Sequence, residues 1–124
     1  MKKILIVAFI LAFIASSAVA DLPIRYPDMV KLYGKPDYAN RMTGKRIFNS
    51  EGMTINAYAE ADSDVLISIE FNRSTPFYEM EIDGLLKSLY ADEEWKQSGK
   101  DWVLKKAKTT AHWNGEGKIT IQGS

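Results

Sequence analysis

The sequence has 124 residues, no cysteine, and 16 basic against 16 acidic side chains, so its formal net charge is zero. This length favours a single domain, because two separate cores would each be marginal. The lack of cysteine excludes disulfides, thiolate metal sites and cysteine nucleophiles, and the neutral charge argues against a protein that coats nucleic acid.

The first 20 residues have the pattern of an export signal. Two lysines near the start precede an unbroken apolar run over residues 4–15, and residues 18–20 (Ala-Val-Ala) have the small-x-small pattern that precedes cleavage. We therefore predict a cleaved signal peptide over residues 1–20 and a single domain over residues 21–124, located in the periplasm or outside the cell. A membrane anchor is the alternative, but a span needs about 20 apolar residues. Because no cysteine is available for lipidation, we expect no stable membrane anchor.

The mature part is expected to begin with an extended stretch and a short helix. Residues 21–27 contain two prolines and no periodicity, which predicts an extended lead-in. A helix is predicted over residues 28–33, because its apolar residues share one face. Gly34 can end this helix in the left-handed conformation, and Pro36 forbids its continuation. Residues 37–44 are expected to form an irregular turn.

Alternation of apolar and polar side chains then predicts a three-stranded meander. The strands are expected over residues 45–49, 53–60 and 65–72. In the third strand, Val65, Ile67, Ile69 and Phe71 are expected to point to one face of the sheet.

A second helix is predicted after the meander. Residues 74–76 (Ser-Thr-Pro) are a helix-start signal, and the apolar residues between Ile82 and Tyr90 recur at helical spacing. Gly84 lies inside this pattern and suggests close contact with a strand. Residues 92–98 are expected to add one more helical turn.

Three further strands are predicted after this turn. They are expected around residues 102–104, 109–113 and 119–121. The order helix, three strands, helix, three strands predicts the α+β class, with an antiparallel sheet of about six strands and two helices on one face. Leu32-Tyr33 is matched by Leu89-Tyr90, and Ile67-Ser68-Ile69 by Ile119-Thr120-Ile121, which suggests a tandem repeat.

Few residues are suited to catalysis. His112 is the only histidine, and it is expected on the less apolar face of its strand without a partner in the sequence pattern. Residues 62–64 (Asp-Ser-Asp) begin like a calcium loop but lack its later ligands. Glu60 or Glu70 could pair with a helix acid as in glycosidases. We expect a protein that is not an enzyme and uses no metal and no cofactor, with a carboxylate-dependent hydrolase as the enzymatic alternative.

Aromatic side chains are the candidate binding residues. Lysines near Trp102 and Trp113 form a mixture that can bind nucleic acid or anionic glycans, but alternation sends Trp102 and Lys105 to opposite faces. Export also argues against nucleic acid as a partner. The residues expected at an interface with a protein or a sugar are Tyr33, Tyr38, Tyr58, Trp95, Trp102 and Trp113.

Several segments together have a familiar pattern. They are Leu32-Tyr33-Gly34-Lys35-Pro36-Asp37, Gly52-Met53-Thr54-Ile55, Glu81-Ile82-Asp83-Gly84-Leu85-Leu86, Trp95, Trp102 and Ala111. This pattern resembles a group of small exported bacterial proteins of unknown function. The helix, the Gly-x-Pro turn and the meander are also similar to the small outer-membrane barrel-assembly lipoproteins and to the tandem-repeat β-lactamase-inhibitor proteins, which work by binding other proteins. The chain differs from the former in having no cysteine to lipidate, and the resemblance to the latter carries over no binding residue.

These observations predict a non-catalytic, soluble exported protein. We expect it to contact another envelope or secreted protein as an accessory, an inhibitor or a structural subunit. The alternative is a carbohydrate- or lipid-binding module that uses exposed tryptophan and tyrosine side chains.

Overall fold

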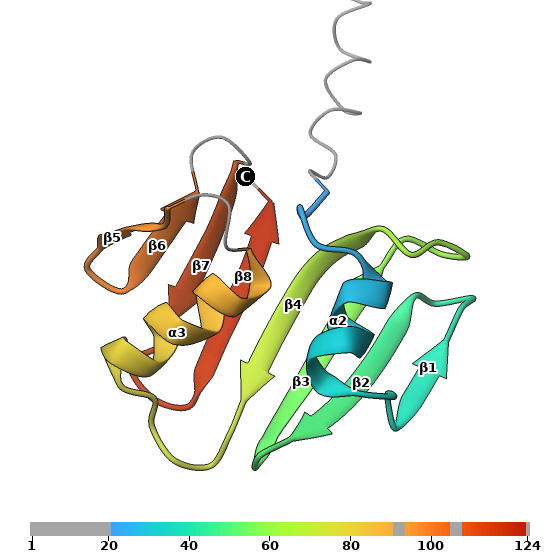
Figure 1. Ribbon diagram of the computed structural model, residues 1–124, viewed down its shortest axis with the longest axis horizontal. Coiled ribbons are helices and arrows are strands. Elements are labelled where there is room, and N and C mark those ends of the chain that lie inside the picture. Colours follow the sequence, from blue (N-terminus) through green and yellow to red (C-terminus); the bar gives the residue numbers. More distant parts are fainter. Residues whose placement is uncertain (1–20, 91–93, 105–107, 124) are drawn as a thin grey trace, which may run out of the picture.

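The computed structural model describes residues 21–90, 94–104 and 108–123. These residues form one antiparallel sheet of eight strands with two helices on one of its faces (Figure 1). The predicted α+β class, the antiparallel sheet and the two helices are confirmed, but the prediction of six strands is wrong. The predicted signal peptide over residues 1–20 lies outside the described residues.

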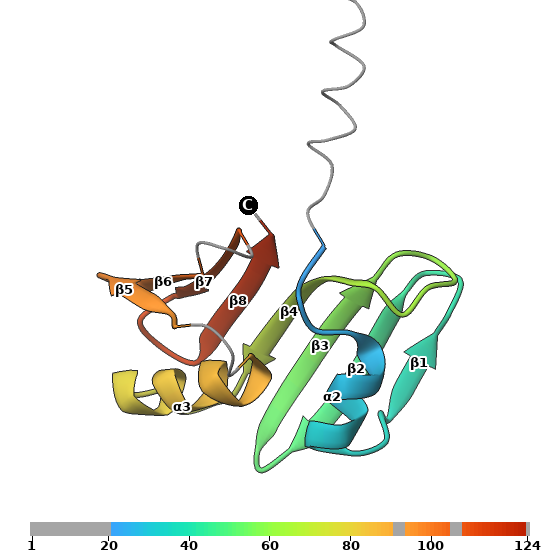
Figure 2. The same cartoon turned by 45° about the horizontal axis from the view of Figure 1, so that its top comes forward.

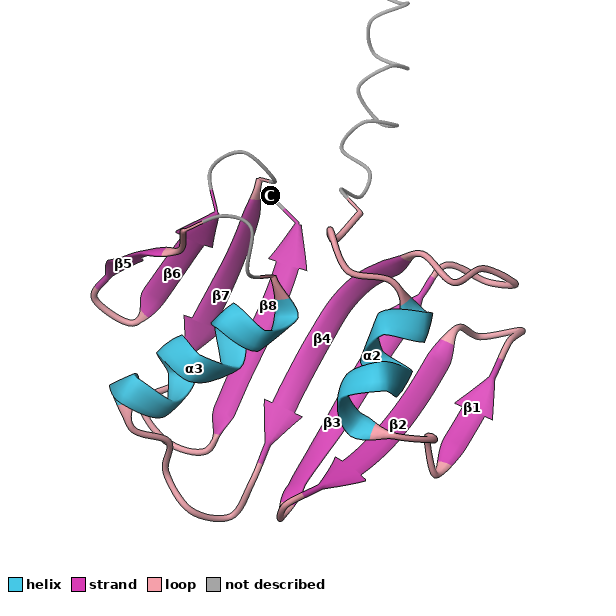
Figure 3. Cartoon of the chain, in the orientation of Figure 1, coloured by secondary structure: helices cyan, strands magenta, loops and turns pink. Residues whose placement is uncertain are grey.

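Each helix is followed by four strands, and this unit occurs twice along the chain (Figure 3). In chain order the elements are α2 (Tyr26–Tyr33), β1 (Tyr38–Asn40), β2 (Lys45–Ser50), β3 (Met53–Ala59), β4 (Leu66–Asn72), α3 (Glu79–Leu89), β5 (Lys96–Ser98), β6 (Asp101–Leu104), β7 (Thr109–Trp113) and β8 (Lys118–Gly123). The strand order across the sheet is β1-β2-β3-β4-β8-β7-β6-β5. The last strands of the two units therefore meet in the middle, and their first strands form the two edges.

The two edge strands were not expected from the sequence. Residues 38–40 were predicted as an irregular turn, and residues 96–98 were predicted as helix, but both segments are three-residue strands. Each pairs with the next strand along the chain through a tight turn, as in Tyr38 opposite Ile47 and Ser98 opposite Asp101. Three residues are too few to display an alternating pattern, so the partner strand decides their conformation. Residues 92 and 93, the start of the predicted helical turn, lie outside the described residues.

A β-bulge corrects the predicted face of the fourth strand. The register between β3 and β4 shifts at Tyr58 and Ala59, which pair with Ser68 and Leu66 and leave Ile67 as the extra residue. Leu66 is consequently fully buried, whereas Ile67 is only half-buried. The prediction that Ile67 shares a buried face with the later apolar residues of the strand is wrong, because periodicity does not reveal a bulge.

Both helices begin with the same acidic cap. The Arg25 backbone N–H donates to the Asp28 carboxylate at 3.0 Å, and the Tyr78 backbone N–H donates to the Glu81 carboxylate at 2.8 Å. A carboxylate in the first turn satisfies a free N–H group and suits the positive end of the helix dipole. These caps place the helix starts at Tyr26, two residues before the predicted start, and at Glu79, beyond the Ser-Thr-Pro signal.

The Arg73 side chain explains why the second helix does not start at the proline. Its guanidinium donates to the carbonyls of Thr75 and Pro76 and forms an ion pair with Glu81. It also lies over the Phe77 ring, with Cζ 4.1 Å from the ring centroid. These contacts hold residues 74–77 in a turn between β4 and α3.

The core lies between the helices and the sheet. Figure 2 shows both helices on the same side of the strands. The buried residues include Met29 of α2, Ile82 and Leu86 of α3, and the sheet side chains Phe48, Ile55, Ile69, Phe71, Trp102, Ile119 and Ile121. Arg46 is buried in the same layer, with its guanidinium 4.2 Å from the centroid of the Tyr26 ring and one N–H group donated to the Ser63 carbonyl.

The centre of the core is the pairing of β4 with β8. Ile69 lies opposite Ile121 and Phe71 lies opposite Ile119, and each of these side chains is at most 2% exposed. This pair of strands joins the two units into one sheet.

Replacing Ile121 by alanine is therefore expected to lower the free energy of unfolding by about 2–5 kcal/mol, because it leaves a cavity at the junction. Urea unfolding followed by circular dichroism measures this loss. Ile67→Ala in the adjacent strand is the control, and its cost should be clearly smaller because Ile67 is half-buried. Equal losses for the two variants would contradict the assigned register.

Gly84 was expected to contact a strand, and this expectation is wrong. A Cβ atom at Gly84 would meet no atom within 4 Å, and the residue lies exposed on α3. We expect Gly84→Ala to raise the free energy of unfolding by about 0.5–1 kcal/mol, because alanine has the higher helix propensity. Gly44→Ala is the opposite control. Its φ is +81°, and its Cβ would lie 1.9 Å from the Ala59 carbonyl oxygen, so this variant should be destabilised.

The cap of α3 makes a pH-dependent contribution to stability. Hydrogen bonds from the Arg73 side chain and the Tyr78 backbone lower the pKa of Glu81 below its ordinary value of 4.5. The stabilisation is fully present above pH 4.5 and is lost as the pH falls through the lowered pKa. We expect Glu81→Gln to be less stable than the wild type at pH 7, with the difference shrinking towards pH 3. Urea unfolding at both pH values measures this. A difference that is constant with pH would contradict the ion pair.

Candidate interaction surface on the open face of the sheet

The face of the sheet that points away from the helices, here called the open face, is covered by no other described element. Its side chains alternate along each strand with those of the core. Cross-strand pairing lines them up in two rows that run across all eight strands. The first row is Tyr38, Ile47, Asn56, Glu70, Thr120, His112, Asp101 and Ser98. The second row is Asn40, Lys45, Tyr58, Ser68, Gln122, Thr110, Val103 and Lys96.

The open face is rich in groups that both donate and accept hydrogen bonds. Asparagine, glutamine, threonine and serine side chains make up seven of the sixteen residues in the two rows, and none of the sixteen is fully buried. A network at one end adds to them, where Asn49 donates to Asp37 at 2.6 Å and accepts from Thr54 at 3.0 Å. Such a surface can match a partner that presents hydroxyl, amide or backbone groups.

The two acids of the open-face rows are paired with basic side chains of the same face. His112 Nδ1 lies 2.6 Å from Asp101 Oδ1, and Lys118 Nζ lies 3.7 Å from Glu70 Oε2. The His112 and Asp101 side chains are 62% and 48% exposed, so the pair is open to solvent. The prediction that His112 lies on the less apolar face is confirmed, and its partner Asp101 was not expected, because it lies on a neighbouring strand.

The two acids of the open-face rows are far apart. Glu70 and Asp101 are separated along their row by Thr120 and His112, which is three strand spacings or about 14 Å. Glycosidase carboxylates lie about 5–9.5 Å apart. Glu70 also points away from the helices, so the sheet separates it from the acids of α3. Among the described residues, no group of three His, Asp or Glu side chains is placed to hold a metal ion.

Two of the six predicted interface aromatics lie on the open face. Tyr38 is 46% exposed at the β1 edge, and its hydroxyl accepts a hydrogen bond from Asn40 at 3.2 Å. Tyr58 is half-buried, with Lys45 Nζ 5.9 Å from its ring centroid. Tyr33 lies on the helix side instead, where its ring contacts Phe48 and Phe71 and burial raises the pKa of its hydroxyl.

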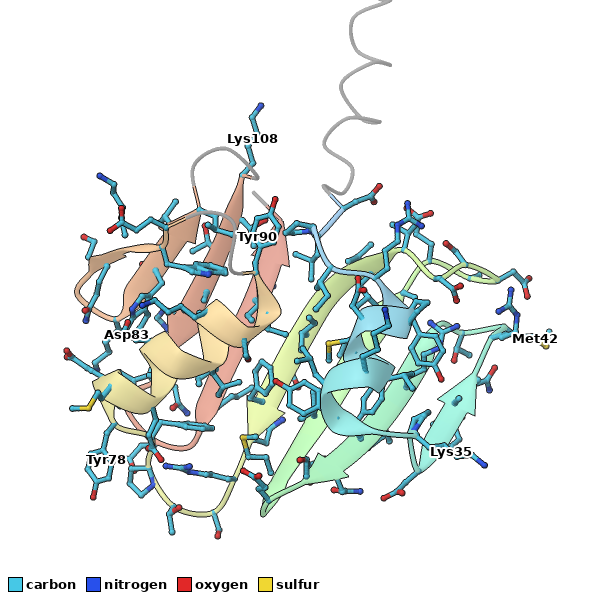
Figure 4. All side chains as sticks on the ribbon, viewed as in Figure 1. Lys35, Met42, Tyr78, Asp83, Tyr90 and Lys108 are labelled. Carbon is cyan, nitrogen blue, oxygen red and sulfur yellow. The ribbon has the colours of Figure 1, made fainter. Side chains whose placement is uncertain are left out.

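The three tryptophans stabilise the fold from the helix side. Trp102 is 1% exposed and donates its indole N–H to Asp83 of α3 at 2.8 Å; Figure 4 labels Asp83 on that helix. Trp95 donates to the Leu86 carbonyl, and Trp113 donates to the Glu116 carbonyl. Both of these rings are half-buried against the core. Of the predicted set, this leaves Tyr38 and Tyr58 on the open face.

Among the residues that the structure describes, large exposed apolar side chains do not gather in one patch. Met42 lies at the turn after β1, whereas Tyr78 and Met80 lie at the start of α3, and Figure 4 shows these two places at opposite ends of the molecule. A small apolar crevice of about 10 Å³ lies between the lead-in to α2, the end of α3 and the β4–β8 junction. It has room for about one water molecule. The open face is therefore the most extended candidate for a binding surface among the described residues.

Comparison with protein families, with curated proteins and with solved structures found no match to this chain. Within the described residues, no helix is long and apolar enough to cross a membrane.

Proposed function

We propose that this chain is an exported, non-catalytic protein that binds another envelope or secreted protein through the open face of its sheet. It would act there as an accessory, an inhibitor or a structural subunit. The export part of this proposal depends on the leader pattern in residues 1–20. The binding part depends on the one-sided covering of the sheet.

The observation that carries the binding proposal is the arrangement of side chains on the open face. Two rows of eight residues present amides and hydroxyls at regular cross-strand spacing, with Tyr38 and Tyr58 among them. Tyrosine supplies contact area and a hydrogen-bonding hydroxyl at small entropic cost, and it is enriched in protein interfaces. Because Glu70 and Asp101 are already paired within the face, a partner does not need to neutralise either of these acids.

The same geometry argues against turnover. His112 has an acidic partner, but both side chains are more than 45% exposed, and a catalytic base gains its effect in a site that excludes water. The wide separation of Glu70 and Asp101 removes the acid pair that a carboxylate-dependent hydrolase would need on this face.

A carbohydrate-binding function is the second candidate. The observation that favours it is the position of tyrosine rings among amide and hydroxyl groups, since Tyr38 is bonded to Asn40 and Tyr58 lies opposite Ser68. Sugars present hydroxyl groups for such amides and C–H faces for aromatic rings. The tryptophans do not add to this candidate, because their indole N–H groups already donate to other residues of the chain.

The test uses matched variants on the two sides of the molecule. Tyr38→Ala and Gln122→Arg alter the open face, whereas Tyr78→Ala and Met80→Arg make the same kinds of change at exposed positions next to or on α3. The wild-type protein and the four variants are immobilised and cross-linked to the envelope and secreted fractions of the host. We expect one protein to be captured at a reproducible ratio, and its capture to fall about tenfold or more with the open-face variants only.

Two outcomes would contradict the proposed interface. One is recovery of no partner after cross-linking, and the other is equal loss with the variants on the helix side. Titration of a panel of soluble glycans, followed by calorimetry, distinguishes the second candidate. Binding of a glycan that is lost with Tyr38→Ala would replace a protein partner by a sugar.

A further inference from the structure

We infer that the leader must be removed before the first residues of the domain dock onto the sheet, because the folded domain buries the chain from the second residue after the cleavage site. The bond concerned joins Ala20 to Asp21. This inference rests on the export proposed above, and it adds an order of events to that proposal.

The chain enters the fold one residue after this bond. Leu22 is 5% exposed, and its backbone N–H donates to the Leu66 carbonyl at 2.9 Å. Ile24 is also 5% exposed. Both side chains belong to the core, where they lie close to Ile69 and Ile121 of the β4–β8 junction. Asp21 alone separates the bond from the buried segment.

A second set of contacts fixes the other end of this segment. Arg25 forms an isolated β-bridge with Val65, and the Tyr26 backbone N–H donates to the Asp64 carbonyl at 3.0 Å. Residues 22–26 are thus paired with residues 64–66 at both ends, and Figure 2 shows this lead-in running beside the start of β4 to reach α2.

A peptidase requires the chain on both sides of the bond to be free. It binds its substrate as an extended strand through backbone hydrogen bonds, and bonds in paired, buried backbone are cut only from a locally opened state. The Leu22 N–H cannot donate to Leu66 and to a peptidase at the same time. Opening also exposes Leu22 and Ile24 to water, which makes the open state rare.

The order of folding and cleavage therefore decides whether the domain is released. A chain that is cleaved while residues 22–26 are still free folds as a separate domain. A chain that docks these residues first keeps its leader, because the folded state protects the bond. Docking of the lead-in to α2 therefore blocks removal of the leader, and the same segment is part of the core.

The experiment compares cleavage of the purified full-length precursor in detergent by a bacterial signal peptidase, before and after unfolding in urea. The key variant carries six Gly and Ser residues between Asp21 and Leu22. The matched control carries the same six residues between Glu51 and Gly52, in the exposed turn of the β2–β3 hairpin. Cleavage is followed by gel and mass spectrometry.

We expect the folded wild-type precursor and the control to be cut at least tenfold more slowly than their unfolded forms. The variant with the insert after Asp21 should be cut at similar rates in both states. Leu22→Ala should lie between these limits, because it removes part of the buried contact. Equal rates for the folded wild type and the insert variant would overturn the inference and leave the proposed export intact.

A measurement on the fold itself separates the two proposals. Amide hydrogen exchange on the folded precursor should show Leu22 and Tyr26 protected at least tenfold relative to an unfolded chain. Unprotected amides would overturn the inference that docking of residues 22–26 blocks cleavage. If no precursor is cut, even when unfolded, then the assignment of residues 1–20 as a cleaved leader is wrong, and the export proposal and this inference both fail.

Discussion

The pairing of β4 with β8 is the constraint on which the rest of the structure depends. These strands are the last elements of two units that each consist of a helix and four strands. Neither unit alone offers a core larger than one helix on four strands, and a chain of this small size buries only a modest share of its surface. The opposed pairs Ile69–Ile121 and Phe71–Ile119 join both helices to one continuous apolar layer. The absence of cysteine gives this layer greater weight, because burial rather than disulfide bonding must hold the fold.

The layer of side chains that faces the helices shows how two units with different side chains share one backbone arrangement. Across the middle of the sheet, one row runs from Arg46 through Ala57 and Ile69 to Ile121, Ala111 and Trp102. The inner positions of this row are the same residue types in both units. The outer positions differ, since Arg46 stacks on Tyr26 of α2, whereas Trp102 bonds to Asp83 of α3. Each large side chain fixes its own helix, so the backbone symmetry tolerates unlike contacts at the two ends.

One-sided covering links the two proposals. Both helices lie on one face, so the other face must be compatible with water, and amides and hydroxyls at its alternate positions meet that requirement. The same groups form a surface that a partner can bind. On the helix side, the lead-in of α2 closes the core beside the β4–β8 junction, and the proposed leader would be attached directly to this segment. The proposed binding surface and the proposed control of leader removal therefore lie on opposite sides of one sheet.

The sequence by itself determined the class of the fold, both helices and six of the eight strands, because long alternating or helical patterns report which side chains are buried. It also placed His112 on the outer face. It did not reveal the edge strands or the bulge at Ile67, since three-residue strands and register shifts are decided by partner strands. It named the tryptophans as interface residues, and only the tertiary structure showed that each indole N–H donates to another residue of the chain. Only the tertiary structure brought Asp101 to His112 and lined up the polar rows of the open face, because cross-strand neighbours are set by register and not by distance along the chain.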